Sequence, residues 1–114
     1  MTAAVDELSV TFAALADPTR RAILTRLSGG EATVGQLAEP FALTQQAISK
    51  HIKVLERAGL VSRSKSAQAR PCRIEPERFE IVADWIGQHR KVWRERYDRL
   101  DAHLSALQAG SPDS

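Results

Sequence analysis

Cysteine is almost missing from this chain of 114 residues, because Cys72 is its single example. One thiol cannot close an internal disulfide, and alone it does not make a structural zinc site. Long apolar runs are missing too, since no stretch approaches the roughly 18 residues that cross a membrane. The segment MTAAVDELSV lacks the basic start and apolar run of a signal peptide. These absences predict a cytoplasmic protein with no membrane partner.

The patterns that catalysis requires are also lacking. The chain has no glycine-rich phosphate loop and no clustered carboxylate pair at the end of a strand. Its three histidines lie on separate turns, so no nucleophile or acid–base pair gathers in one place. We therefore expect neither an enzyme nor a bound cofactor.

Charge is present but unevenly distributed. The net charge is only +2, yet residues 44–78 hold eight lysines and arginines against three acids, a net of +5. The rest of the chain consequently sums to −3. This asymmetry predicts one basic face and a neutral to acidic remainder.

The stretch TQQAISKHIKVL, residues 44–55, reads as a helix with two faces. At about 100° per residue, Ile48, Ile52 and Leu55 share an apolar side. The opposite side carries amides, a hydroxyl and cations but no carboxylate, and Arg57 extends it by one turn. A helix that needs only solubility usually mixes charge signs. This polar face therefore indicates a negatively charged partner.

Helix and turn signals along the chain give the order helix–turn–helix–wing. Asp17 and Pro18 begin a second helix, Thr33 and Gln36 form a capping box, and Thr44 is the next N-cap. We expect a mainly α fold with a small β-hairpin and a long C-terminal helix. A single domain of residues 1–109 should contain a helix–turn–helix at 33–58, a wing at 60–75 and terminal dimerisation helices at 4–15 and 77–109. A disordered tail at 110–114 should follow it.

Both terminal helices carry apolar stripes. Residues 86, 93, 100 and 107 are seven apart, which is a heptad seam, and the long helix exceeds what so small a domain covers. Large aromatic side chains on it would be costly to leave exposed. The alternative is that this helix folds back as ordinary core. We expect a homodimer with contacts from Leu8, Phe12, Ile86, Trp93, Tyr97, Leu100, Leu104 and Leu107.

At this point a family resemblance is visible. The stretches FAALADPTRRAILTRL and TVGQLAEPFALTQQAISKHIKVLERAGLV, followed by an arginine-rich wing, resemble ArsR/SmtB-type winged-helix repressors over about residues 12–75. The resemblance implies a homodimeric transcriptional repressor on double-stranded DNA, with a palindromic operator. It also implies that the 45–58 helix lies in the major groove and the wing on the adjacent backbone.

Some members of that family sense metals, and this chain departs from their patterns. Thr33 and Gly35 stand where those members carry a Cys-x-Cys pair. Asp101 and His103 match half of a second, C-terminal zinc pattern, but no further histidine follows. We expect no metal site, because threonine and glycine supply no thiolate.

The polar face and the wing supply the candidate DNA contacts. Gln46 suits base reading, because a side-chain amide pairs with adenine in two places, while Lys50 and Lys53 suit phosphates. The full expected set is Thr44, Gln45, Gln46, Ser49, Lys50, Lys53, Arg57, Arg63, Lys65, Arg70 and Arg73. Each of these side chains has the alternative of being merely solvated.

Four other residues have competing interpretations. One of Arg20 and Arg21 is a candidate for phosphate contact, and the alternative for either is pairing with an acid. His51 is expected to be packed or to touch phosphate, rather than to ligate metal or catalyse. Cys72, between basic residues, is either a thiol of lowered pKa or an unreactive strand cysteine. A different class of function, a winged-helix adaptor that binds protein and not DNA, would not need the acid-free face.

Overall fold

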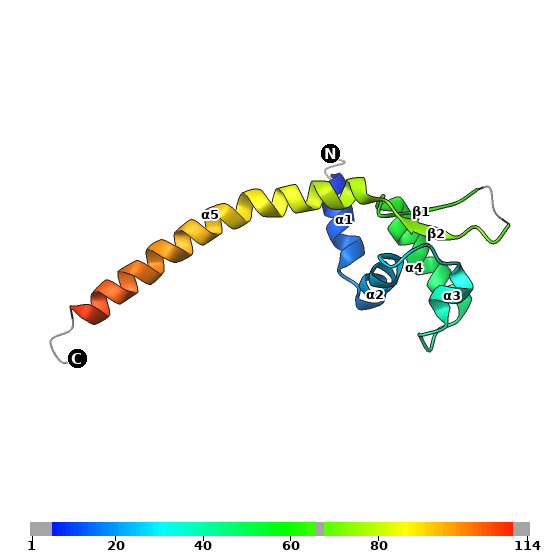
Figure 1. Cartoon of the computed structure of the whole chain (residues 1–114), viewed down its shortest axis with the longest axis horizontal. Coiled ribbons are helices and arrows are strands. Elements are labelled where there is room, and N and C mark those ends of the chain that lie inside the picture. The colour runs from blue at the N-terminus through cyan, green and yellow to red at the C-terminus, as the bar shows by residue number, and fades with distance from the viewer. Residues whose placement is uncertain (1–5, 66–67, 111–114) are drawn as a thin grey trace. The chain divides into compact units, whose positions relative to one another are not determined.

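The chain forms five helices and a two-stranded hairpin in a computed structural model that describes residues 6–65 and 68–110 (Figure 1). The elements are α1 (Glu7–Leu15), α2 (Pro18–Leu27), α3 (Val34–Ala38), α4 (Gln45–Arg57), β1 (Val61–Arg63), β2 (Cys72–Ile74) and α5 (Pro76–Ala109). Contacts divide the chain into two units, residues 1–82 and 83–114. The expected fold class, mainly helical with a hairpin and a long C-terminal helix, is confirmed.

Side-chain caps begin the helices where the sequence places them. Asp17 accepts a hydrogen bond from the Arg20 amide, and Thr44 accepts one from the Ala47 amide. Thr33 and Gln36 form both bonds of the predicted capping box. These caps satisfy amide groups that a helix start leaves without partners. The Thr44 cap therefore sets the start of α4.

The core of the first unit gathers the apolar faces of α2, α3, α4 and the hairpin. Ile48, Ile52 and Leu55 of α4 are completely buried, as are Ile23 of α2 and Leu37 of α3. Burying a side chain of this size contributes about 1.5–3 kcal/mol. The three α4 residues thus hold the helix in one rotational setting, with its polar side outward.

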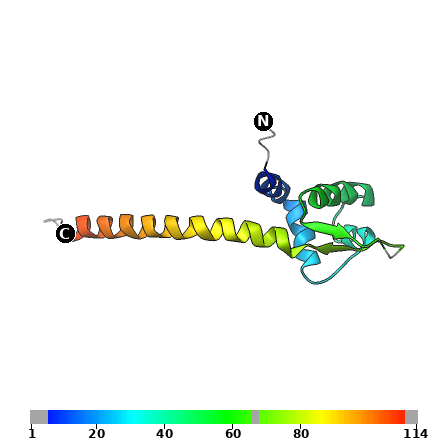
Figure 2. The same ribbon diagram turned by 90° about the horizontal axis from the view of Figure 1, so that it is seen from above.

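A sharp turn joins α4 to the hairpin. Gly59 has φ +75°, a conformation that side chains disfavour, and a Cβ there would meet the Arg78 guanidinium at 3.0 Å. The strands then pair antiparallel, with Val61 opposite Ile74 and Arg63 opposite Cys72. Figures 1 and 2 both show the hairpin reaching out from the body of the first unit.

The second unit is helical to Ala109. Its apolar stripe is exposed, including Ile86, Trp93, Leu100, Leu104 and Leu107. The expectation of a disordered tail concerns residues 110–114, of which 111–114 lie outside the described residues. The same holds for residues 4–5 at the expected start of the first helix.

Candidate nucleic-acid interface

The outer face of α4 is polar and open. Gln45, Gln46, Lys50 and Lys53 are exposed and Ser49 is partly exposed. With Thr44 and Ala47, these residues line one shallow hollow of about 600 Å³. Arg57 is exposed in the last turn of the same helix. No acid lies among the residues that line the hollow, so it presents donors and positive charge to solvent.

The described residues form no ion pair with the α4 cations Lys50, Lys53 and Arg57. Four ion pairs occur among the described residues, and none involves Lys50, Lys53 or Arg57. An unpaired surface cation keeps its full charge for an external anion. These three residues are therefore well placed for phosphate contact.

The two glutamines differ in their surroundings. The Gln45 amide nitrogen lies over α3, 3.5 Å from the point where a Cβ on Gly35 would stand. The Gln46 side chain does not approach any described glycine in this way. Gln45 thus lies close to α3, while both glutamines are exposed and line the same hollow.

The wing carries three further exposed cations, Lys65, Arg70 and Arg73. Arg73 Nε lies 3.4 Å from a Glu75 oxygen and donates to Ser62 Oγ, yet 63% of its side chain is exposed. Its charge is partly offset, while its guanidinium still faces solvent. Residues 66–67 of the expected hairpin tip lie outside the described residues.

Arg63, also expected to bind DNA, faces the protein instead. Its Nε lies 3.3 Å from Glu56 Oε1 of α4, and only 16% of its side chain is exposed. Nε and Nη2 are buried without a hydrogen-bond partner among the described residues, so the pair is close but poorly aligned. This placement does not favour phosphate contact by Arg63. The ion pair between Glu56 and Arg63 could not be predicted from the sequence, because the two residues belong to different elements.

Arg20 and Arg21 donate to backbone carbonyl oxygens of the protein. Arg20 donates to the carbonyl oxygens of Ala14 and Ala13, and Arg21 donates to that of Leu15. These carbonyls lie at the end of α1, where helix geometry leaves them without internal partners. The two arginines therefore fasten α1 to α2.

His51 is packed, as one of its two expected roles requires. Its Nδ1 lies 3.8 Å from Asp17 Oδ2 and 3.4 Å from Arg20 Nη1. The Arg20 amide, followed by the nearby His51 and Arg20 side chains, holds the pKa of Asp17 below its ordinary value. His51 thus connects α4 to the start of α2. Among the described residues, no three potential metal ligands cluster.

Cys72 is an unreactive strand cysteine. Its side chain is fully buried, and its backbone bonds to Ala32 in both directions. Burial raises the pKa of the Cys72 thiol above its ordinary value, despite the nearby Arg63 charge that opposes the rise. The alternative of a lowered thiol pKa was wrong, because desolvation outweighs the neighbouring cations.

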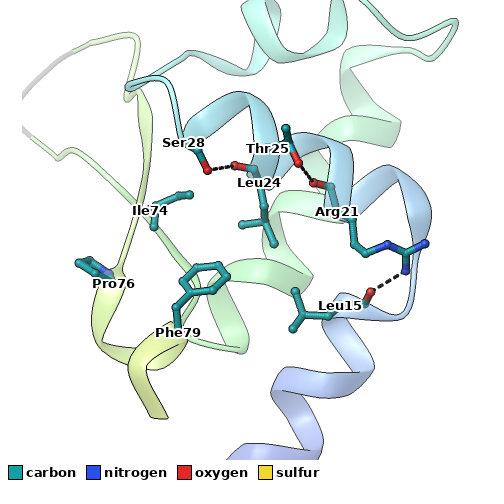
Figure 3. A pocket seen from close by; sticks show the side chains of 8 residues that line it. All are labelled: Leu15, Arg21, Leu24, Thr25, Ser28, Ile74, Pro76 and Phe79. Carbon is teal, nitrogen blue, oxygen red and sulfur yellow. Dashed lines mark hydrogen bonds between the residues drawn. The ribbon is translucent and has the colours of Figure 1, made fainter. Parts of the chain in front are cut away.

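One apolar groove of about 390 Å³ lies elsewhere on the first unit, between α2, β2 and the first turn of α5 (Figure 3). Leu24 and Phe79 form much of its wall. The hydroxyl groups of Thr25 and Ser28 donate to backbone carbonyls of α2, as the figure shows. The one charged side chain among the lining residues, Arg21, donates to the Leu15 carbonyl oxygen.

The fold and the open basic helix define a winged helix–turn–helix protein. Residues 15–63 match the family described as a helix-turn-helix domain. The chain is 42% identical over 57 residues to the transcriptional repressor SdpR of Bacillus subtilis, which covers 50% of this chain and 63% of SdpR. The chain thus spans a little under two thirds of that relative.

Two solved structures resemble the chain over most of their length. One is an ArsR family transcriptional regulator, with 44% identity, a TM-score of 0.72, and coverage of 78% of this chain and 98% of that one. The other is a homodimeric winged helix–turn–helix DNA-binding domain, Mb0332 of Mycobacterium bovis, described as a possible ArsR-family regulator. It has 25% identity, a TM-score of 0.60, and coverage of 83% and 85%. The chain belongs to the ArsR family of transcriptional regulators.

No helix among the described residues is long and apolar enough to cross a membrane.

Proposed function

We propose that this protein is a homodimeric, sequence-specific regulator of transcription that binds double-stranded DNA through the outer face of α4. The observation that carries the proposal is the contrast between the two sides of that helix. Ile48, Ile52 and Leu55 are fully buried, while the opposite side presents amides and unpaired cations. An α-helix with this outer face fits the major groove, where base edges and phosphates both accept hydrogen bonds.

The contacts divide into two roles. Gln46 reads a base edge, with Gln45, Ser49 and Thr44 beside it at the start of the helix, where recognition helices reach the bases. The cations position the protein on the backbone. They are Lys50, Lys53 and Arg57 on α4, and Lys65, Arg70 and Arg73 on the wing.

The proposed function requires a dimer because the DNA-binding surface of one α4 helix is small. One helix of 13 residues offers few base contacts, whereas two on one face of the duplex read a palindromic operator. The exposed stripe on α5 and the stripe on α1, with Leu8 and Phe12, supply the dimer contacts. Residues 1–109 act as one functional domain, in which the terminal helices dimerise. Mb0332, a structural relative, is described as homodimeric.

The regulator acts as a repressor in the cytoplasm. A dimer that occupies a promoter excludes polymerase from it, and the relative SdpR is a repressor. A winged-helix adaptor that binds protein is the alternative. The free cations of α4 favour the DNA-binding function, because an adaptor has no need of an acid-free face.

A mobility-shift titration with the DNA upstream of the protein's own gene tests the proposal. We expect a retarded complex that survives excess random DNA. A double variant, Lys50→Glu with Lys53→Glu, should abolish it, since both substitutions place carboxylates against phosphates. The matched control is Lys91→Glu, on an exposed position of α5. Equal loss in the control, or no complex with the unaltered protein, would argue for the adaptor.

A further inference from the structure

Glu56 is the one acidic residue of α4. At about 100° per residue, it lies about 80° around the helix from the buried Ile48, on the flank of the outer face. A carboxylate at that place repels phosphates, and it therefore opposes DNA binding by the cations of the same helix. An acid on this helix is consistent with the proposed function only if its charge has a partner within the protein.

The partner of Glu56 is Arg63, the last residue of β1. The Arg63 Nε atom lies 3.3 Å from Glu56 Oε1, and most of the Arg63 side chain is buried. In the hairpin, Arg63 is paired with Cys72, and this is the last strand pair before the loop of residues 64–71. The ion pair therefore joins the end of α4 to the base of the wing loop.

The position of Arg63 depends on the charge of Glu56. A guanidinium group stays protonated in proteins, so Arg63 cannot become neutral when it is buried. Its Nε and Nη2 atoms have no hydrogen-bond partner among the described residues, so the nearby carboxylate offsets the cost of their burial. Without the Glu56 charge, Arg63 would move toward solvent and take the end of β1 with it.

The hairpin needs a restraint of this kind. A two-stranded hairpin has little stability of its own, and each strand here has only three residues. Two backbone hydrogen bonds hold β2 to Ala32 at Cys72. The ion pair between Glu56 and Arg63 holds the other strand, β1, at the end from which the wing loop begins.

We propose that Glu56 and Arg63 are positioning residues that hold the wing at the angle to α4 at which both contact the same DNA. The inference rests on the proposed function, and it gives Arg63 a role that does not include phosphate contact. Buried residues of its inner face fix the setting of α4, so a shift of β1 leaves the helix in place. The same shift moves the exposed wing cations Lys65 and Arg70 away from the DNA backbone.

Glu56→Gln tests the proposal through the sign of its effect. The substitution removes the charge but keeps the size of the side chain and one oxygen acceptor. Electrostatics alone predicts tighter binding, because a negative charge leaves a DNA-binding helix. We expect weaker binding to the operator instead, by on the order of tenfold, as is typical when residues in direct contact are uncoupled. Glu39→Gln, which removes an exposed acid at the end of α3, is the matched control and should cause no loss.

Variants of Arg63 test whether the two residues act as a pair. Arg63→Gln should weaken binding by a similar factor, and the double variant with Glu56→Gln should lose no more than either single variant. Arg63→Lys keeps a cation that can reach Glu56, so it should retain most of the affinity. Losses that add in the double variant would mean that the residues act separately, and would overturn the proposal.

A wing-deficient background separates positioning from a general effect on the fold. Lys65→Ala with Arg70→Ala removes wing cations, and adding Glu56→Gln to this background should cost little further affinity. Thermal unfolding of each variant without DNA reports its stability, and an anisotropy titration reports its affinity. Tighter binding by Glu56→Gln, or an equal loss in the wing-deficient background, would overturn the positioning role and leave the proposed function intact. An unaltered protein that does not bind its operator would overturn the proposed function and this inference together.

Discussion

Replacing Lys53 with alanine should flatten the salt dependence of operator binding. Lys53 is exposed in the middle of the outer face of α4 and takes part in no ion pair seen among the described residues. Each phosphate that a cation neutralises contributes about 0.9 to the slope of log affinity against log salt. A dimer loses two such contacts, so the slope should fall by about 1.8. When salt rises from 50 to 200 mM, both proteins lose affinity. The factor by which the unaltered protein's affinity falls should be about twelve times larger than the factor for the variant.

The assay is a fluorescence anisotropy titration at several salt concentrations, with operator and random duplexes in parallel. Because phosphate contacts carry no sequence information, the variant should weaken on both duplexes by a similar factor. Lys91→Ala is the matched control, since it removes the same charge from an exposed position on α5. An unchanged slope for Lys53→Ala, or an equal change for Lys91→Ala, would refute the assignment of Lys53 to the interface.

Four further outcomes are expected. Gln46→Ala should cost about 1–3 kcal/mol on the operator and little on random DNA, so equal losses in the two titrations would make it a backbone contact. Trp93→Ala should shift the protein toward monomer in sedimentation and weaken operator binding with the recognition helix intact; a stable dimer with normal binding would exclude Trp93 from the interface. Cys72 should react with a thiol reagent at pH 8 far more slowly in the folded protein than in denaturant, because burial raises its pKa; equal rates would contradict that burial. Zinc should leave operator affinity unchanged, since Asp101 and His103 lack a second pair of ligands, and a tenfold shift reversed by chelator would contradict this.

Much of the first unit was predictable because local chemistry decides it. The capping box at Thr33 and the N-caps at Asp17 and Thr44 are short-range signals that the structure reproduces. The two faces of α4 follow from helical periodicity alone. The two strands, at 61–63 and 72–74, lie within the expected wing at 60–75.

The sequence did not predict the partners of the arginines, because their long side chains reach groups that spacing does not reveal. Arg63 turns back to Glu56 across the junction between α4 and the wing. Arg20 and Arg21 reach the carbonyls at the end of α1. Basic composition predicts a charged surface, but tertiary contacts decide which groups each guanidinium bonds to.

The central claim is that two copies of α4 enter successive major grooves on one face of a palindromic operator. Hydroxyl-radical footprinting of the protein on its own upstream DNA tests it most directly. We expect two protected half-sites, about 10–10.5 base pairs apart centre to centre, or a multiple of that spacing. In the Gln46→Ala variant, both half-sites should lose protection together, at protein concentrations at which the unaltered protein still gives a footprint. A single protected site, or uniform protection that ignores sequence, would contradict the account.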